Sequence, residues 1–341
     1  EETMAVNNGS ALDAFFEEIK NLGRITKMYG PLFKSLERAK KDIAVLLSIT
    51  NNNCSYTGIE GDYHVLLETQ LPVETICEEE VANGILSGYK VLVLEGINYL
   101  PKPVYTKIED FIKQGGRVFV DKSSKLDVPG SMRIATWEEL VEKASVCVKQ
   151  NIGTSPQQDV VAREFNGGGI TYLWLANTYT DRWVIGTQLY NTPVVPKAVT
   201  FDLKLSESAH VYDVLKGREI QSGKEGNTYN ITLDEAGGTL LALYPDDIGD
   251  IHLICPQSIK RDDNVEIGVR VDCRGLGLQP VEIKVLDPNG HDSEYSCIST
   301  AARGILNLKW SFAINDAPGK WEIIVKELTT GKSVEKQLMV K

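Results

Sequence analysis

Apolar residues near the amino terminus recur every three or four positions, which is the spacing of one helical face. Between residues 10 and 22 this spacing is continuous and predicts an amphipathic helix. The apolar positions of that face are Leu12, Phe15, Phe16, Ile19 and Leu22. Gly30 and Pro31 then predict a break in the chain, and a second apolar cluster follows at 32–36. We interpret residues 1–37 as a helical lead-in segment.

The pattern changes at residue 42 to short, continuously apolar runs that alternate with amphipathic stretches. Apolar runs without alternation are typical of strands buried on both faces of a parallel sheet. The predicted strands are 42–48, 71–76, 89–96 and 117–121, with 145–148 as a strand that closes the sheet. The predicted helices lie around 63–67, at 103–112 and at 136–144. Strands separated by helices predict a parallel α/β domain over 38–150.

Helical periodicity ends near residue 150, and short strands bounded by Gly, Asn, Asp and Pro follow. Strands at this spacing indicate antiparallel sandwiches. A polar linker at 245–250 divides this part of the chain into two blocks, which we place at 151–247 and 248–341. The predicted fold class is therefore α/β plus all-β, with one parallel-sheet domain followed by two antiparallel β-sandwich domains.

Composition narrows the classes of function. The chain has 341 residues, 42% of them apolar, and a formal net charge of -11. Each predicted domain is large enough to bury a core, whereas a polyanionic partner is disfavoured, so we expect no nucleic-acid binding. No apolar run reaches the length of about eighteen residues that a membrane span requires. The first ten residues lack the basic-then-apolar layout of a signal peptide.

The cysteines and histidines form no metal-binding pattern in the sequence. No Cys-x-x-Cys pair occurs, and the four histidines are far apart along the chain. We therefore expect no metal and no cofactor. The six cysteines are interpreted as buried or free thiols, with a disulfide among Cys255, Cys273 and Cys297 as the alternative.

Several stretches of the sequence resemble one group of bacterial enzymes. The phrases "FFEEIKNLGRITKMYGPLFKSL", "KDIAVLLS", "LSGYKVLVLEGINYLP" and "IEDFIKQGGRVFVD" are similar to the region that follows the catalytic barrel in family-42 β-galactosidases and related glycoside hydrolases. That resemblance implies a flavodoxin-like, class I glutamine-amidotransferase-like domain that takes part in trimerisation or another oligomeric assembly. The later phrases "VAREFNGGGITYLWLANTYTDRW" and "INDAPGKWEIIVKELTTGKSVEKQLMVK" look like the small all-β domain of such hydrolases and like macroglobulin-like or immunoglobulin-like accessory domains.

The resemblance implies an accessory role for this stretch of chain. A catalytic (β/α)₈ barrel needs about 250 residues and eight repeats, and four or five βα repeats are visible here. The implied partners are an upstream catalytic domain of the same gene and further copies of the chain, joined through the α/β domain. The implied location is the periplasm or the cell exterior if the parent protein is exported, and the cytoplasm otherwise.

The strand at 117–121 ends where active relatives of the amidotransferase fold carry a nucleophile. In the family pattern this elbow holds a cysteine between glycines, whereas the matching positions here are Asp121, Lys122 and Ser123. A serine hydroxyl is a weak nucleophile unless a base accepts its proton, and the glycine spacing of a strained elbow is missing. We therefore expect no catalytic residue in this chain.

Two kinds of binding residue remain as candidates. At the ends of the predicted parallel strands, Asn51, Asn52, Asp121 and Ser123 could contact a ligand or a partner's active site, and the resemblance adds Asn98 and Tyr99. In the predicted sandwich, Tyr179 and Trp183 fall in or beside a turn, where aromatic faces could stack on a sugar.

Three hypotheses follow from the sequence. The first is a non-catalytic accessory region of a β-galactosidase-like hydrolase. The second is a multidomain protein that binds carbohydrate or a cell surface, and the third is an active α/β hydrolase or amidotransferase.

Overall fold

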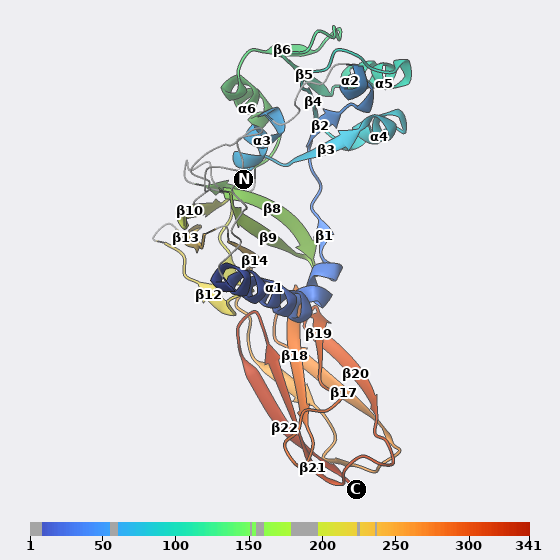
Figure 1. The fold of residues 1–341 in the computed structure, drawn as a ribbon, viewed down its shortest axis with the longest axis vertical. Coiled ribbons are helices and arrows are strands. Elements are labelled where there is room, and N and C mark those ends of the chain that lie inside the picture. Colours follow the sequence, from blue (N-terminus) through green and yellow to red (C-terminus); the bar gives the residue numbers. More distant parts are fainter. Residues whose placement is uncertain are drawn as a thin grey trace.

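The computed structural model describes residues 9–54, 61–150, 152–154, 160–178, 197–223, 226–235 and 237–341. The protein is mostly β, with several sheets and few helices. Three sheet regions follow one another along the long axis of the molecule, with the parallel sheet at one end and the C-terminal strands at the other (Figure 1).

The first region is a five-stranded sheet in the order β3-β2-β4-β5-β6, and every neighbouring pair in it is parallel. Its strands are β2 (Ile43–Leu47), β3 (Val73–Cys77), β4 (Val91–Leu94), β5 (Arg117–Asp121) and β6 (Met132–Ile134). Its helices are α2 (Ile49–Cys54), α3 (Gly61–Glu68), α4 (Glu78–Ala82), the 3₁₀ turn η1 (Ile85–Gly88), α5 (Lys102–Lys113) and α6 (Trp137–Ser145). The parallel strands and intervening helices that the apolar runs predict are therefore present.

Alternate residues of each strand in this sheet serve two separate cores, because successive side chains of a strand point to opposite faces. Ala44 and Leu46 of β2 belong to the core that α4 and α5 cover. Ile43 and Val45 belong to the core that α3 and α6 cover. Burial on both faces explains why these strands have continuous apolar sequences.

The predicted closing strand at 145–148 was wrong. Helix α6 runs to Ser145, its cap residue Val146 is 83% exposed, and the Cys147 N–H donates to Ala144 O as the helix ends. The edge strand next to β5 is β6 instead, and only Ile134 of its three residues is buried. An edge strand with one buried side chain has no apolar run, so hydrophobic periodicity does not reveal it.

The second region consists of two antiparallel sheets that enclose one core. One sheet has the strand order β1-β8-β9-β14-β11-β12 and the other has the order β13-β10-β7. These strands are β1 (Glu37–Arg38), β7 (Ile152–Thr154), β8 (Val160–Gly167), β9 (Ile170–Asn177), β10 (Val199–Leu205), β11 (His210–Asp213), β12 (Arg218–Ile220), β13 (Thr228–Leu233) and β14 (Gly238–Tyr244). Strand β10 alternates strictly between buried and exposed residues, as the predicted sandwich requires.

The third region is an eight-stranded sheet in the order β15-β17-β20-β19-β18-β21-β22-β16. Its strands are β15 (Ile251–Ile254), β16 (Ser258–Ile259), β17 (Asn264–Val271), β18 (Leu278–Leu286), β19 (Cys297–Ala302), β20 (Ile305–Ser311), β21 (Gly319–Glu327) and β22 (Ser333–Val340). Trp310 and Trp321 lie in its core, 8% and 3% exposed, which confirms the interpretation of these tryptophans as core residues. All six cysteines are free thiols, so the alternative of a disulfide was wrong.

Helix α1 (Gly9–Ser35) lies between the second and third regions (Figure 1). Tyr29 and Leu32 of this helix are buried in a core that both β regions share. The predicted break at Gly30 and Pro31 was wrong, because the helix continues through Pro31. A proline inside a helix costs about 3 kcal/mol, and the burial of the two flanking apolar side chains offsets that cost.

The two β regions also contact each other through buried polar groups. The Tyr172 hydroxyl accepts a hydrogen bond from Leu278 N at 2.8 Å and donates to Leu278 O at 2.9 Å. Gln279 is fully buried and its Nε2 donates to the Tyr244 hydroxyl at 2.8 Å. Because Tyr172 and Tyr244 come from the second region and Leu278 and Gln279 from the third, these regions form one packed body.

Candidate functional site

The polar residues at the carboxyl ends of the parallel strands form the candidate functional site. Ser48 and Asn51 follow β2, and Glu95 to Tyr99 follow β4. Asp121 is the last residue of β5, and Lys122 to Ser124 come directly after it. The carboxyl ends of parallel strands meet at one edge of a sheet, and ligands of such sheets bind there. The structure therefore brings together the strand-end residues that the sequence singled out.

Asn51 is committed to internal contacts. Its side chain is 1% exposed, and Nδ2 donates to Gly96 O at 2.9 Å. Its Oδ1 accepts hydrogen bonds from Asn98 N at 2.7 Å and Tyr99 N at 3.3 Å. Asn51 thus joins the loop after β2 to the loop after β4, and a ligand cannot reach its amide without displacing these bonds.

Asp121 is the centre of a second internal network. Its Oδ1 accepts hydrogen bonds from Gly96 N at 2.9 Å and Ser124 N at 3.0 Å, and its Oδ2 accepts one from Ser123 N at 3.0 Å. The hydroxyl groups of Ser123 and Ser124 also donate to this carboxylate. Burial acts to raise the pKa of Asp121, but the hydrogen bonds from both serines and from Gly96 outweigh it, so the pKa is lowered.

Ser124 is the structural partner that the sequence reasoning missed. Its side chain is 3% exposed, and its Oγ accepts a hydrogen bond from Ile97 N at 2.8 Å. The signal that could have found it is the Asp-Lys-Ser-Ser order of 121–124. Aspartate commonly accepts hydrogen bonds from the backbone two and three residues further on, which closes a tight turn.

This network leaves Ser123 without the features of a nucleophile. Its hydroxyl donates to Asp121, a carboxylate with a lowered pKa and hence a poor general base. His210, His252 and His291 all lie in the β regions, and the side chain of His64 on α3 is outside the described residues. Among the described residues, the arrangement offers no base–nucleophile pair at this edge.

A cavity of about 380 Å³ opens beside the Asp121 network. Its polar and aromatic lining comprises Glu95, Asp121, Lys122, Thr136, Trp137 and Glu138. Trp137 is 54% exposed, whereas Glu95 is 8% exposed. Carboxylates, an ammonium group and an aromatic face can hydrogen-bond and stack on a polar ligand.

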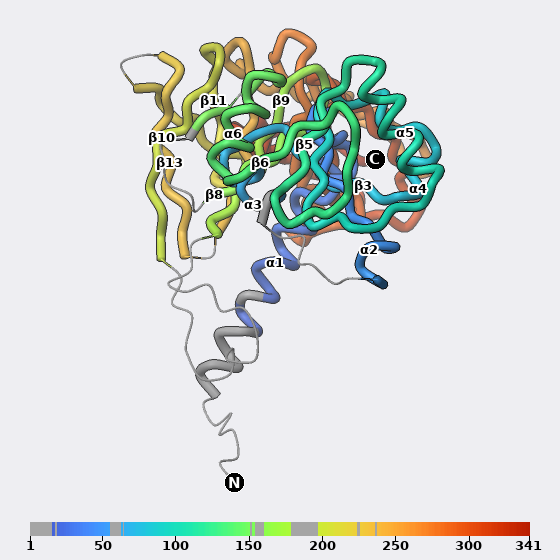
Figure 2. The backbone as a smooth tube through the Cα atoms, turned by 90° about the horizontal axis from the view of Figure 1, so that it is seen from above, coloured from blue at the N-terminus to red at the C-terminus, as the bar shows by residue number. Residues whose placement is uncertain are grey.

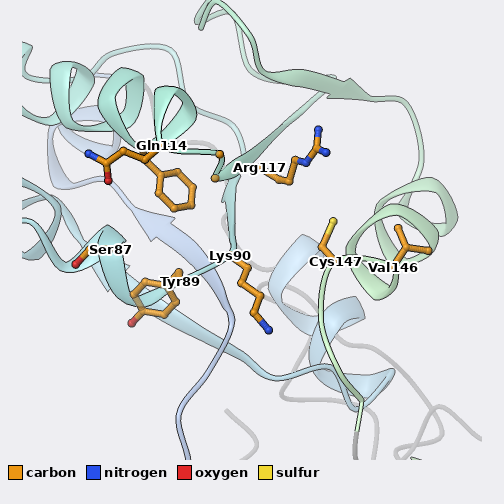
Figure 3. Close-up of a pocket in the computed structure, with 10 residues that line it drawn as sticks. Ser87, Tyr89, Lys90, Gln114, Arg117, Val146 and Cys147 are labelled. Carbon is orange, nitrogen blue, oxygen red and sulfur yellow. The ribbon is translucent and has the colours of Figure 1, made fainter.

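A second cavity, of about 430 Å³, lies at the opposite, amino-terminal edge of the sheet (Figure 3). Lys90 and Arg117, which precede β4 and begin β5, line it together with Tyr89, Gln114 and Cys147. Lys90 forms an ion pair with Asp42 at 2.8 Å. This edge lies away from the strand ends where α/β sheets bind their ligands, so we place the candidate site at the carboxyl edge.

The remaining predicted residues have different positions. Asn52 lies in α2 and is half-exposed, while Asn98 is half-exposed and its Oδ1 accepts a hydrogen bond from Lys125 N at 2.9 Å. The Tyr99 side chain is 53% exposed at the same edge. Tyr179 and Trp183, the proposed sugar-stacking residues, lie outside the described residues.

Comparison with known proteins identifies no family. No protein-family model and no curated protein sequence matches the chain. The chain is similar in part to α-L-fucosidase isoenzyme 2 from Paenibacillus thiaminolyticus, with 12% identity over 66% of this chain and 51% of the fucosidase chain and a TM-score of 0.46. It spans about half the length of that fucosidase.

Two further solved structures are similar to parts of the chain. One is the native α-2-macroglobulin of E. coli. The match has 14% identity, covers 51% of this chain and 14% of the macroglobulin chain, and has a TM-score of 0.25. The other is a CARDB domain from Pyrococcus furiosus. That match has 14% identity, covers 28% of this chain and 88% of the CARDB chain, and has a TM-score of 0.21. Likenesses of this degree establish neither a family nor a function. Within the described residues, no helix combines the length and the apolar composition that a membrane-spanning helix needs.

The roles of the two adjacent asparagines can be separated by mutation. We expect Asn51→Ala to lower the free energy of unfolding by about 2 kcal/mol, because it removes the acceptor of the Asn98 N–H and the donor to the carbonyl of the buried Gly96. Asn52→Ala, one residue further on and half-exposed, should change it by less than about 0.5 kcal/mol. Urea unfolding followed by circular dichroism measures both values. Equal effects of the two substitutions would show that Asn51 does not hold the loops together.

Proposed function

We propose that this chain is the non-catalytic accessory region of a bacterial, β-galactosidase-like glycoside hydrolase. In this proposal the parallel sheet is a flavodoxin-like, amidotransferase-like domain without a nucleophile, and the β regions are accessory domains. The strand order β3-β2-β4-β5-β6 supports the flavodoxin-like assignment, because it follows the order 2-1-3-4-5 of that fold when the strands are numbered along the chain.

The observation that carries the non-catalytic part of the proposal is the use of the carboxyl edge. Asn51 and Asp121 occupy the positions where a catalytic or ligand-binding group would be expected, and both direct their polar atoms at the protein's own loops. Ser123 occupies the position of the nucleophile and donates to Asp121. In the proposal, these paired groups stabilise the loops at the carboxyl edge and do not act on a substrate.

Helix α1 supports the accessory part of the proposal. The part of the helix nearer its C-terminal end lies in the shared core, whereas Ile19 and Leu22 are 47% and 60% exposed. Figure 2 shows this part of α1 running outward from the body of the molecule. These exposed apolar residues continue a buried stripe. Covering them with another surface would stabilise the association by about 25 cal/mol for each Å² of apolar area buried. In the proposal that surface belongs to an upstream catalytic domain, and further copies of the chain assemble through the parallel-sheet domain.

The proposal predicts that the isolated chain has no glycosidase activity. We expect no release of nitrophenol from aryl β-galactosides or other aryl glycosides above the rate in buffer, because the proposal assigns the catalytic pair of carboxylates to an upstream domain. Sedimentation velocity on the same preparation should detect a species larger than the monomer.

Glu95→Gln is the control variant for this assay, because Glu95 is the most buried carboxylate of the cavity at the carboxyl edge. Turnover that is present in the natural chain and lost in Glu95→Gln would overturn the non-catalytic assignment. Turnover lost in Ser123→Ala would instead favour an active hydrolase that uses this serine.

A further inference from the structure

A histidine and two carboxylates converge on the second region, away from the candidate site. His210 begins β11, Glu219 lies in β12 and Asp247 lies in the loop after β14. Tyr212 is directly opposite Glu219 in the antiparallel pair of β11 and β12. Because residues two apart on a strand share a face, His210 and Glu219 project from the same face of the sheet.

The three side chains are close enough to act together. His210 Nδ1 lies 2.7 Å from Glu219 Oε1. One ligand atom from each of the three residues lies within 4.8 Å of the other two. Two ligands of one tetrahedral zinc ion, each at about 2.1 Å from the metal, lie about 3.4 Å apart. His210 and Glu219 are half-exposed and Asp247 is exposed, so small rotations of these side chains would bring all three onto one ion.

A buried tyrosine orients the second carboxylate of the group, that of Asp247. Tyr212 is 2% exposed, and its hydroxyl donates to Asp247 Oδ1 at 2.6 Å while accepting from Ile248 N at 3.0 Å. Hydrogen bonds from outer residues to ligating carboxylates are a regular feature of metal sites, where they orient the ligand. The Tyr212 bonds also anchor the start of the linker that leads from β14 into the third region.

Two other histidine–carboxylate pairs provide a comparison within the same molecule. His252 lies 2.9 Å from Asp272, and His291 lies 3.5 Å from Asp287. Within the described part of the chain, only the group at His210 gains a third potential ligand. An exposed ion pair contributes only about 0–1 kcal/mol to stability. The His210–Glu219 pair by itself therefore does not explain why a second carboxylate lies beside it. A divalent cation would neutralise the two adjacent negative charges.

We propose that His210, Glu219 and Asp247 form a binding site for a divalent transition-metal ion of the zinc type. One imidazole nitrogen and two carboxylate oxygens suit zinc, whereas calcium and magnesium prefer sites made of oxygen alone. Water completes the coordination, since the His210 and Glu219 side chains are 43% and 33% exposed. The bound ion would tie the β11–β12 hairpin to the linker between the two β regions. This site does not depend on the proposed accessory function.

The test is calorimetric titration of the full chain with zinc chloride, after removal of any histidine tag and treatment with a chelator. We expect one zinc ion per chain. His210→Ala and Glu219→Gln should each weaken binding by at least about tenfold, and Tyr212→Phe should weaken it by about tenfold through the outer hydrogen bond. His252→Ala is the matched control, because it removes a histidine from a pair without a third ligand, and it should leave binding unchanged.

Cobalt(II) provides a second readout that excludes the six free cysteines as ligands. Cobalt bound at His210 should have a visible spectrum without the thiolate charge-transfer band that a cysteine site produces. Absence of stoichiometric zinc binding to the natural chain would overturn the proposal. Binding that persists in both His210→Ala and Glu219→Gln would overturn it as well, with or without the thiolate band.

Discussion

An Asp121→Ala variant will lose about 3 kcal/mol of stability in the parallel-sheet region. The carboxylate accepts hydrogen bonds from the backbone N–H groups of Gly96, Ser123 and Ser124 and from both serine hydroxyls. Its removal leaves the 3%-exposed Ser124 and the buried Gly96 without a charged acceptor. Hydrogen bonds to a charged group are worth more than neutral ones, and donors left unpaired in the interior pay their full desolvation cost.

Hydrogen exchange measures this loss of stability at the individual amide groups near Asp121. The amide protons of Gly96, Ile97 and Ser124 should exchange much faster in Asp121→Ala than in the natural chain. Asp110→Ala is the matched control, because the Asp110 carboxylate is 45% exposed and forms a surface ion pair with Lys113. That substitution should change stability by less than about 1 kcal/mol. If the two variants exchange alike, Asp121 does not organise this edge.

The effect of Asp121→Ala should also depend on pH. The pKa of Asp121 is lowered in the folded state, so its stabilising contribution is fully present above the ordinary aspartate pKa of about 3.9. The contribution is lost as the pH falls through the lower folded-state value. The difference in stability between the natural chain and Asp121→Ala should therefore be constant near neutral pH and shrink below about pH 4. A difference that grows on acidification would contradict the lowered pKa.

A Gly168→Ala variant will lose about 4 kcal/mol of stability at the junction of the two β regions. Gly168 has a φ of +60°, and an added Cβ would lie 2.2 Å from the backbone oxygen of Gly277. Backbone atoms on both sides cannot rotate away as a flexible side chain can. The two segments must separate, and the hydrogen bond from Gly277 N to Gly168 O, now 2.9 Å long, would be lost.

Differential scanning calorimetry is the appropriate measurement for this junction. Because Tyr172 bonds to Leu278 in the same contact, Gly168→Ala should lower the transition of the β regions and separate it into two. Gly275→Ala is the matched control: it has a φ of +73° but nothing within 4 Å of an added Cβ. It should cost only about 1–2 kcal/mol from the left-handed backbone. Equal losses of stability in Gly168→Ala and Gly275→Ala would mean that the close contact between Gly168 and Gly277 does not determine the stability of the junction.

The elements that the sequence predicted well are those with a strong local pattern. The continuous apolar runs that gave β2 and β4 reflect burial on both faces, and the alternation in β10 reflects burial on one. The errors occurred where distant contacts outweigh local preference. Pro31 stays inside α1 because Tyr29 and Leu32 are covered by strands far along the chain. The edge strand β6 pairs through its backbone and has no apolar signal.

The same division applies to the candidate site. Position at a strand end was enough to select Asn51, Asp121 and Ser123, because strand ends can be recognised from the apolar runs before them, whereas Asn98 was added by the family resemblance. The sequence did not reveal which contacts these side chains make. Whether an asparagine faces solvent or is 1% exposed depends on the loop that covers it, and for Asn51 that loop begins 45 residues later, at Gly96.

By itself, the sequence determined the order of the regions, the periods of their helices and strands, and the absence of a nucleophile elbow after β5, since each depends on neighbouring residues. Only the tertiary structure decided that Asp121 and Asn51 bind the protein's own loops and that α1 joins the two β regions. It also decided that His210, Glu219 and Asp247 converge, although 37 residues separate the first from the last. The physical reason is that chain folding, not local pattern, brings distant polar groups within hydrogen-bonding or ligand distance.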